Sequence, residues 1–136
     1  MIKQLTVFLS NSKGRLTALA RALGEAGINM SALTIADTTD YGIVRIVCDR
    51  PEVAVVALTE AGFTASIAEV VGVEVPHEPG GLAKVLSALD GADINIEYSY
   101  CFANARNGAT VALKADTRAV EVLAQAGFTI VEQADL

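Results

Sequence analysis

Residues 77–82 have the sequence HEPGGL, and 66 residues earlier, at positions 11–16, the chain has NSKGRL. Each stretch follows a run in which apolar residues alternate: Leu5, Val7 and Leu9 before the first, and Val71, Val73 and Val75 before the second. Alternation with a period of two is typical of a strand. Each stretch also opens a segment whose apolar residues recur at helical spacing. The sequence therefore predicts the same corner from strand to helix twice.

The similarity extends through both halves of the chain. AGINM at 26–30 matches ADINI at 92–96, and EAGFTASI at 60–67 matches QAGFTIVE at 125–132. Self-similarity at a nearly fixed offset indicates a duplicated structural unit. We expect two domains, residues 1–69 and residues 70–136, with almost no linker, because AEVVGVEV at 68–75 continues from one strand pattern into the next.

Each copy shows the order strand, helix, strand, strand, helix, strand. Strands are expected near 2–10, 28–37, 42–49 and 63–70, and again near 70–76, 94–104, 108–115 and 127–133. Helices are expected near 14–26, 51–61, 80–91 and 117–126. This order predicts an α+β fold of two tandem ferredoxin-like βαββαβ units, each an antiparallel sheet with helices on one face.

The first helix of each copy carries an apolar stripe. Its members are Leu16, Leu19, Ala20 and Leu23 in the first copy and Leu82, Val85, Leu86 and Leu89 in the second. A stripe at this spacing faces the core, so all eight side chains are expected to point inward. Glycines follow three of the helical segments, at positions 27, 62 and 127, where a left-handed residue commonly ends a helix. DTTDYG at 37–42 and Asn107-Gly108 are typical of hairpin turns.

The opposite sheet face is unusually apolar. Phe8, Ile43, Val47, Tyr98 and Tyr100 alternate away from the side chains that face the helices. A face that meets solvent is normally polar. We therefore expect the other copy or a second chain to cover it, which favours a homodimer.

Composition limits the classes of function. The chain of 136 residues is 52% hydrophobic and 19% charged, with a formal net charge of −6. An acidic chain without a basic patch disfavours binding to nucleic acids and to anionic membranes. Every apolar run ends well short of a membrane span. The N-terminal stretch lacks a small-residue cleavage site, so it predicts a strand rather than a signal peptide, and cytoplasmic residence is expected.

The two turns are candidate ligand sites. Backbone N–H groups at the start of a helix can bind a carboxylate or phosphate, and glycine lets a ligand approach the backbone closely. Asn11 and His77 end their strands beside the turns, and Asn29 and Asn95 begin the second strands. We expect each copy to bring these polar groups to the same end of its sheet. The alternative is a structural role, since asparagine also caps helices and stabilises turns.

The sequence gives little support for catalysis or for metal binding. Cys48 falls on the inward face of a strand and is expected in the core. Neither Cys101 nor His77 has a partner in the sequence that marks a nucleophile or a base. No Cys-x-x-Cys turn and no phosphate-binding loop is present. We expect no catalytic residue, no metal and no cofactor; an enzyme would require turnover that is lost in His77→Ala.

These residues resemble the ACT family. The βαββαβ order and the Pro-Gly turn after the first strand match HEPGGL well and NSKGRL in part, and the stretch at 26–47 is similar to small stand-alone tandem ACT proteins. The resemblance implies regulatory binding of an amino acid or related metabolite where ACT units meet, without catalysis. In such domains a polar residue of the turn and an asparagine opening the second strand contact the ligand. This chain departs from the pattern at Lys13, where proline is expected, and at His77, where asparagine is common.

The implied ligand-binding residues are Asn11, Ser12, Lys13, Gly14, Arg15, Leu16, Asn29 and Met30 in the first copy, and His77, Glu78, Pro79, Gly80, Gly81, Leu82, Asn95 and Ile96 in the second. Two functions stay open. The first is a regulatory sensor of an amino acid. The second is a ligand-free interaction module that docks through its apolar sheet face as a regulatory subunit of a metabolic enzyme or transporter.

Overall fold

The computed structural model describes residues 1–37, 40–103 and 108–136. Its residues form two compact units. The first unit contains Lys3–Ala68, and the second contains Glu69–Leu136 together with Met1 and Ile2. The two units are described separately below.

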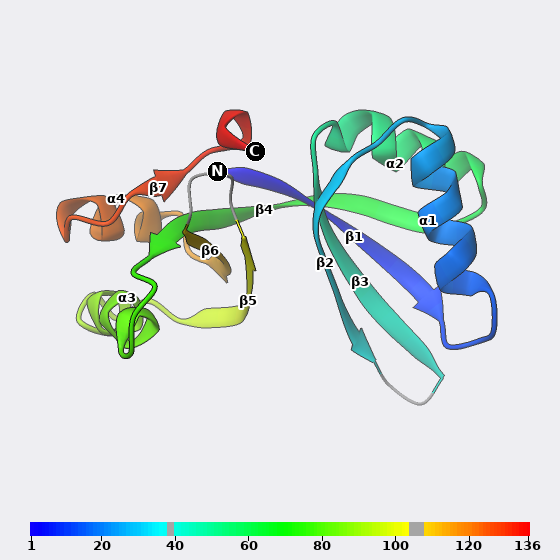
Figure 1. Cartoon of the computed structure of the whole chain (residues 1–136). Helices are drawn as coiled ribbons and strands as arrows, with labels where there is room; N and C mark the ends of the chain where they lie inside the picture. Colours follow the sequence, from blue (N-terminus) through cyan, green and yellow to red (C-terminus); the bar gives the residue numbers. More distant parts are fainter. Residues whose placement is uncertain (38–39, 104–107) are drawn as a thin grey trace. The chain divides into compact units, whose positions relative to one another are not determined.

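The first unit has the predicted βαββαβ order (Figure 1). Its elements are β1 (Ile2–Ser10), α1 (Arg15–Glu25), β2 (Met30–Asp37), β3 (Tyr41–Cys48), α2 (Pro51–Glu60) and the first part of β4 (Thr64–Val75). The strands follow the order β2-β3-β1-β4. β3 pairs antiparallel with both β1 and β2. The unit therefore has the antiparallel sheet of a ferredoxin-like fold, as the sequence predicted.

The second unit repeats this arrangement. The rest of β4 is followed by α3 (Gly81–Asp90), β5 (Ile96–Ala103), β6 (Ala109–Ala115), α4 (Arg118–Gln125), β7 (Ile130–Val131) and a short 3-10 helix, η1 (Gln133–Asp135). The strand order is β7-β4-β6-β5, and all three pairings are antiparallel. Apart from η1, each element thus has its counterpart in the first unit.

Several strand limits differ from those expected. The strands predicted at 63–70 and 70–76 form one continuous strand, β4. β7 has two residues instead of the seven expected at 127–133, because the chain turns into η1, where the Asp135 carboxylate accepts a hydrogen bond of 2.9 Å from the Glu132 N–H. β2 and β5 begin two residues later than predicted, since the N–H groups of Ile28 and Ile94 bond to carbonyls of the preceding helices, Leu23 and Leu89.

Each unit has its own hydrophobic core. Leu19 and Leu23 of α1 are buried in the first, and Val85 and Leu89 of α3 are buried in the second. Cys48 lies in the first core, as predicted. Burying a large aliphatic side chain contributes about 1.5–3 kcal/mol, so these four side chains are major contributors to the stability of their units.

The predicted inward stripes are wrong at their first members. Leu16 is 42% exposed and Leu82 is 41% exposed. Both lie in the first turn of their helices, next to the left-handed glycines that precede those helices. Ala20 is also exposed, and Leu86 is half-buried. Ala18 and Ala22 pack against the core of the first unit instead, which rotates the buried face of α1 away from the predicted stripe.

Positive φ angles occur at the predicted helix ends. Gly27, Gly62 and Gly127 have φ of 67°, 88° and 89°. This left-handed conformation lets the N–H of the next residue bond back into the helix, for example Phe63 N–H to the Leu58 carbonyl at 2.9 Å. Asp93, at the end of α3, has φ of 55° and is the non-glycine residue with positive φ among those described. It occupies the position that Gly27 holds in the first unit.

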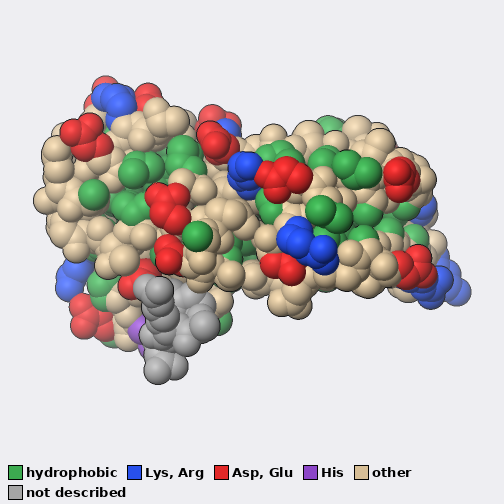
Figure 2. All heavy atoms as spheres, turned by 90° about the horizontal axis from the view of Figure 1, so that it is seen from above, with side chains coloured by type: hydrophobic (Ala, Val, Ile, Leu, Met, Phe, Trp, Pro, Cys, Tyr) green, Lys and Arg blue, Asp and Glu red, His purple; other side chains and the backbone are tan. Residues whose placement is uncertain are grey.

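The face away from the helices is partly open. Phe8 and Tyr41 are 53% and 50% exposed, with ring centroids 6.4 Å apart. Val47 is buried, and Tyr98 and Tyr100 are half-buried. That another copy or chain covers this face stays a prediction. The helix layer also has hydrophobic side chains at its surface over α1 and α2 (Figure 2). The hairpin residues 38–39 and 104–107, which include Asn107, lie outside the described residues.

Candidate ligand pockets

The corner between β1 and α1 is built from backbone hydrogen bonds and one left-handed glycine. The Ser12 N–H donates to the Ser10 carbonyl at 2.9 Å, and the Arg15 N–H donates to the Ser12 carbonyl at 3.3 Å. Gly14 precedes α1 with φ of 86°, a conformation that favours glycine. A Cβ at Gly14 would meet no atom within 4 Å. Glycine is therefore required here by backbone conformation rather than by lack of space.

The corner between β4 and α3 repeats these bonds 66 residues later. The Glu78 N–H donates to the Pro76 carbonyl at 2.8 Å, and the Gly81 N–H donates to the Glu78 carbonyl at 3.0 Å. Gly80 has φ of 83°. A Cβ at Gly81 would overlap the Pro76 carbonyl oxygen, so the second glycine of HEPGGL is required by close packing. The two sequences fold into the same corner although only one contains the Pro-Gly pair.

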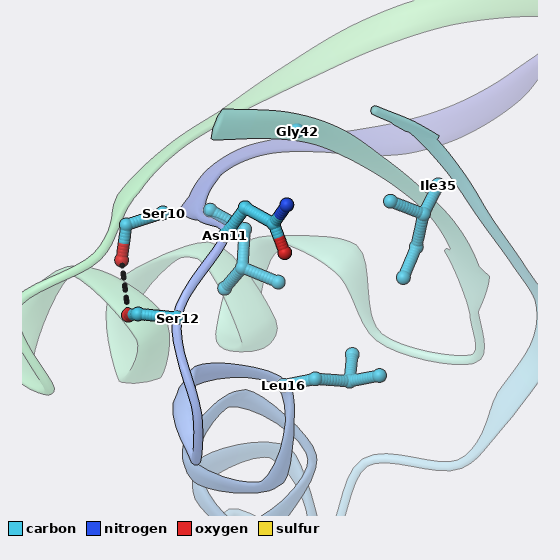
Figure 3. A pocket seen from close by; sticks show the side chains of 7 residues that line it. Ser10, Asn11, Ser12, Leu16, Ile35 and Gly42 are labelled. Carbon is cyan, nitrogen blue, oxygen red and sulfur yellow. Dashed lines mark hydrogen bonds between the residues drawn. The ribbon is translucent and has the colours of Figure 1, made fainter. Parts of the chain in front are cut away.

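Each corner borders a pocket. In the first unit, a pocket of about 140 Å³ is lined by Leu9, Ser10, Asn11, Ser12, Leu16, Ile35 and Gly42. Figure 3 shows the Asn11 amide on the side of the pocket that faces Leu16 and Ile35. The hydroxyl oxygens of Ser10 and Ser12 are hydrogen-bonded to each other at 3.1 Å. The pocket thus combines aliphatic walls with one neutral amide.

The second unit has a pocket at the equivalent place. It has a volume of about 370 Å³ and is lined by His77, Cys101, Phe102, Ala103, Gly108 and Ala109. At the offset of 66 residues, His77 corresponds to Asn11 and Cys101 to Ile35. Ala109 corresponds to Gly42, because Val75 pairs with Ala109 as Leu9 pairs with Gly42. The duplication therefore preserves the position of the pocket and changes its chemistry, from amide and isoleucine to imidazole and thiol.

The asparagines that open the second strands lie elsewhere. Ser10 pairs with Tyr41, whereas Met30, next to Asn29, pairs with Cys48 at the other end of β3. β3 has eight residues, so its ends are roughly 23 Å apart at 3.2–3.4 Å per residue. The expectation that one unit brings Asn11 and Asn29 to the same end of its sheet is wrong, because β2 runs parallel to β1 and begins where β1 begins.

The same correction applies to the second unit. Ile96, next to Asn95, pairs with Ala115, whereas Val75, two residues before His77, pairs with Ala109. Asn95 lines a separate polar pocket of about 420 Å³ together with Asp93, Ile94, Glu97, Lys114, Ala115, Asp116 and Arg118. His77 and Asn95 of one unit therefore lie in different pockets.

A family model described as an ACT domain pair matches residues 1–136 of this chain. The chain belongs to the ACT domain pair family. Among proteins with curated functions, none matches it.

Solved structures with this ACT pair fold include one close relative. Protein BT0572 from Bacteroides thetaiotaomicron is 40% identical over 98% of this chain and 94% of its own, with a TM-score of 0.92. The regulatory subunit of aspartate kinase from Thermus thermophilus, in its ligand-free form, is 20% identical over 92% of both chains, with a TM-score of 0.67. The corresponding subunit from Thermus flavus is 17% identical over 93% of this chain and 94% of its own, with a TM-score of 0.60. The last two are similarities of fold.

In the ACT pair, four of the predicted residues line the corner pockets: Asn11, Ser12 and Leu16 in the first unit and His77 in the second. Arg15 lies elsewhere, because its guanidinium stacks over the Phe63 ring with 4.4 Å between the guanidinium carbon and the ring centroid. Lys13 and Pro79 are exposed and do not line either pocket. Leu82 is exposed at the position equivalent to Leu16.

Glu78 and Asn29 both have local partners. The Lys84 ammonium lies 2.9 Å from the Glu78 carboxylate, and its hydrogen bond lowers the pKa of that carboxyl. The Asn29 N–H donates to the Asp49 carboxylate at 3.1 Å, and the Asn29 carbonyl accepts from the Asp49 N–H at 3.2 Å. These contacts support the structural alternative for the backbone of Asn29.

Met30 and Ile96 mark equivalent irregularities of the two sheets. The register of β2 shifts between Met30 and Ala32, and that of β5 shifts between Ile96 and Tyr98. A β-bulge redirects the side chains of its strand. The same bulge at both positions shows that the duplication extends to the details of strand pairing.

Sequence reasoning missed the pocket walls contributed by the second and third strands. These are Ile35 and Gly42 in the first unit and Cys101, Phe102, Ala103, Gly108 and Ala109 in the second. These residues could have been found only from the expected pairing between the end of each first strand and the neighbouring hairpin. That pairing depends on the strand register, which the sequence does not determine where the lengths of the loops are uncertain.

The described residues contain no group of three or more side chains suited to holding a metal ion. They also include no helix with the length and apolar character needed to cross a bilayer. Burial raises the pKa of the Cys48 thiol, which keeps it protonated and unreactive. Cys101 is the exposed thiol. The corner pockets thus offer an amide or an imidazole beside apolar side chains, an arrangement that suits a small polar ligand.

Proposed function

We propose that this ACT domain pair is a non-catalytic regulatory protein that binds an amino acid or a closely related metabolite in its corner pockets. The observation that carries the proposal is the recurrence of a pocket at the same place in both units, each beside a left-handed glycine that opens a helix. Backbone N–H groups at such a helix start favour a carboxylate, and Asn11 or His77 supplies a hydrogen bond to a second polar group.

Pocket size supports a small ligand. Sites for drug-sized molecules commonly occupy about 300–1,000 Å³. At about 140 Å³, the pocket of the first unit suits a molecule of few heavy atoms. The larger pocket of the second unit, about 370 Å³, has room for a longer side chain. We therefore propose two sites with different ligand preferences.

The opposite positions of Asn11 and Asn29 bear on how a ligand is held. One ligand contacts both an Asn11 and an Asn29 only if these residues come from different ACT units. We propose that they come from two chains of a homodimer. Binding would then promote dimer formation, which light scattering measures as a ligand-dependent rise in mass.

A thermal-shift screen with the twenty common amino acids tests the sensor proposal. A ligand at a hundredfold excess over its Kd stabilises the folded state by about 2.7 kcal/mol. One amino acid should therefore raise the Tm by several degrees, and Asn11→Ala or His77→Ala should remove the rise and show which unit binds. Ser87→Ala, at an exposed position on α3, is the matched control. A screen with no shift, or a shift that survives both pocket variants, contradicts the proposal.

A second candidate function is favoured by the exposed aromatic pair Phe8 and Tyr41. Solvent-exposed aromatic residues on an open sheet face are typical of protein interfaces. Two structures that share this fold are regulatory subunits of aspartate kinase. The alternative proposal is that this chain is also a regulatory subunit, of an enzyme or a transporter. Affinity capture distinguishes the two: Phe8→Ser with Tyr41→Ser should lose an enzyme partner that Gly14→Val retains, whereas Gly14→Val should abolish a ligand response.

A further inference from the structure

The second helix of each unit buries the same face. Ala54 and Leu58 of α2 are fully buried in the first core, and Ala119 and Leu123 of α4 are fully buried in the second. The order of buried, half-buried and exposed residues along the two helices matches when these pairs are aligned. The two helices therefore form an internal comparison between the same element in two sequences.

Their outer faces differ. α2 presents Val53 and Val56, which are 44% and 54% exposed. The aligned positions of α4 hold Arg118 and Glu121, both exposed. An exposed helix face is normally polar, and a helix that is apolar all round is normally covered on every side. α4 follows the rule and α2 departs from it, which marks the outer face of α2 as a surface that another molecule covers.

The valines belong to a shallow groove rather than a flat face. A depression of about 480 Å³ is lined by Ala26, Glu52, Val53, Val56, Ala57 and Glu60, and we call these six residues the α2 groove. Its floor is aliphatic, and the first and last α2 residues that line it, Glu52 and Glu60, carry carboxylates. Figure 2 shows hydrophobic side chains at the surface over α1 and α2, with charged side chains around them.

Charge indicates the chemistry of the occupant. Glu60 lies at the C-terminal end of the groove and is exposed, and Glu25 precedes Ala26 at the end of α1 and is also exposed. Glu52, at the other end, forms an ion pair with Lys3. The chain as a whole has a net charge of −6. Arg50 donates a hydrogen bond of 3.4 Å to the Ala26 carbonyl, so Lys3 and Arg50 offset the acidic charge at that end, and the acidic end of the groove is at Glu60. An aliphatic floor with one acidic end is complementary to aliphatic side chains next to a Lys or Arg.

We propose that the α2 groove docks a short, basic, amphipathic segment of a partner protein. A helix inserted into such a groove would place aliphatic side chains against Val53 and Val56 and a cation beside Glu60. This site is separate from the ligand pocket, which lies at the β1–α1 corner and shares no lining residue with it.

A second copy of the chain is a poorer occupant. Two α2 grooves packed in parallel would bring Glu60 against Glu60, and packed antiparallel they would bring Glu60 towards Glu52, which Lys3 already neutralises. A stable dimer interface also buries about 800 Å² on each partner and involves roughly 20–30 residues a side. Six residues fall well below this size, which fits a transient contact with a peptide segment.

The test uses two synthetic peptides as probes and backbone amide resonances as the readout. Both peptides place leucines at the spacing of helix-in-groove ligands; the remaining positions are lysine in one peptide and glutamate in the other. The lysine peptide should shift the resonances of Ala26, Val53, Val56 and Ala57 and leave those of α4 unchanged. The glutamate peptide should shift none of them, and added salt should weaken binding of the lysine peptide.

The decisive variant carries Val53→Arg and Val56→Glu, the residues of α4, in the full chain. It should bind the lysine peptide at least about tenfold more weakly while retaining its Tm, since the exchanged residues are those that a helix of this kind already tolerates. The reciprocal variant, Arg118→Val with Glu121→Val, controls for hydrophobic contact without the acidic end of the groove.

Three outcomes overturn the proposal. The first is equal binding of the two peptides, which makes the contact purely hydrophobic. The second is the absence of shifts at the groove with either peptide. The third is self-association that depends on Val53 and Val56, which makes a second copy the occupant.

Discussion

The pockets of the two units share a backbone and differ in their walls. Ser12 and Glu78, at equivalent positions, donate the same backbone hydrogen bond in their corners. Their pockets nevertheless expose Asn11 and Ile35 in one unit and His77 and Cys101 in the other. Backbone geometry therefore determines where each pocket lies, whereas side chains of the corner and of β2 or β5 determine its chemistry. Duplication can keep the first property while the second changes.

The largest effects should come from the buried members of the helix stripes. Leu23→Ala and Leu89→Ala each remove a fully or almost fully buried side chain and should lower the free energy of unfolding by about 2–5 kcal/mol. Leu16→Ala and Leu82→Ala, at exposed positions of the same stripes, should lower it by less than about 1 kcal/mol. Urea denaturation measures all four variants. Equal losses within one unit would contradict the assignment of the buried face.

The next effect separates the two corners. Gly81→Ala places a Cβ against the Pro76 carbonyl oxygen and should cost about 1–3 kcal/mol through overpacking. The equivalent position in the first unit holds Arg15, so a side chain is tolerated there. Arg15→Ala should lose only the contact with the Phe63 ring, about 0.5–1 kcal/mol. Thermal denaturation of both variants tests the difference, and a neutral Gly81→Ala would show that the second corner has unexpected freedom.

A smaller effect should appear at the helix ends. Asp93 adopts φ of 55° where the first unit has Gly27, and a left-handed conformation costs a residue with a Cβ roughly 1 kcal/mol. Asp93→Gly should therefore stabilise the second unit by up to about 1 kcal/mol, and Gly27→Asp should destabilise the first by a similar amount. Chemical denaturation provides the measurement. A destabilised Asp93→Gly would mean that the carboxylate makes a compensating contribution.

The smallest effect depends on pH. The pKa of Glu78 is lowered by the hydrogen bond from Lys84, and the equivalent positions Ser12 and Ala18 of the first unit carry no such pair. A carboxyl group whose pKa is lowered by folding stabilises the protein at pH values above its ordinary pKa of about 4.3. This stabilisation is lost as the pH falls through the pKa of the folded state. Glu78→Gln should therefore reduce the Tm slightly at pH 7, with the difference vanishing in strong acid. A constant difference across pH would assign the effect to packing.

Much of the fold could be predicted from the repeated corner. The order of elements, the pairing of Gly14 with Gly80 and the core position of Cys48 all follow from local patterns that recur at one offset. The predicted stripes are wrong at Leu16 and Leu82, which satisfy the helical spacing yet are exposed in the first turn of each helix. Periodicity indicates that a helix has a buried face, but it does not determine every residue of that face, since Ala18 and Ala22 rather than Ala20 pack against the first core.

The candidate sites were only partly predictable. Asn11 and His77 were found because they adjoin the glycine turns in sequence. Ile35 and Cys101 were missed because they reach the pockets through strand register, which no local pattern reveals. Asn29 lies at the other end of the sheet from Asn11 because β2 runs parallel to β1, a relation set by the pairing of both strands with β3. Site residues that are close together in the sequence can be predicted from local patterns. Site residues that lie on different strands can be predicted only when the register of those strands is known.

The continuous strand β4 has a consequence for local opening. Its residues 64–68 belong to the first unit and its residues 69–75 to the second, so one ladder of amides spans two cooperative cores. Amide hydrogen exchange in the first part of the strand should report the opening of the first core, and exchange in the second part that of the second. A destabilising change in one core should then produce a step in protection within a single strand, close to Glu69.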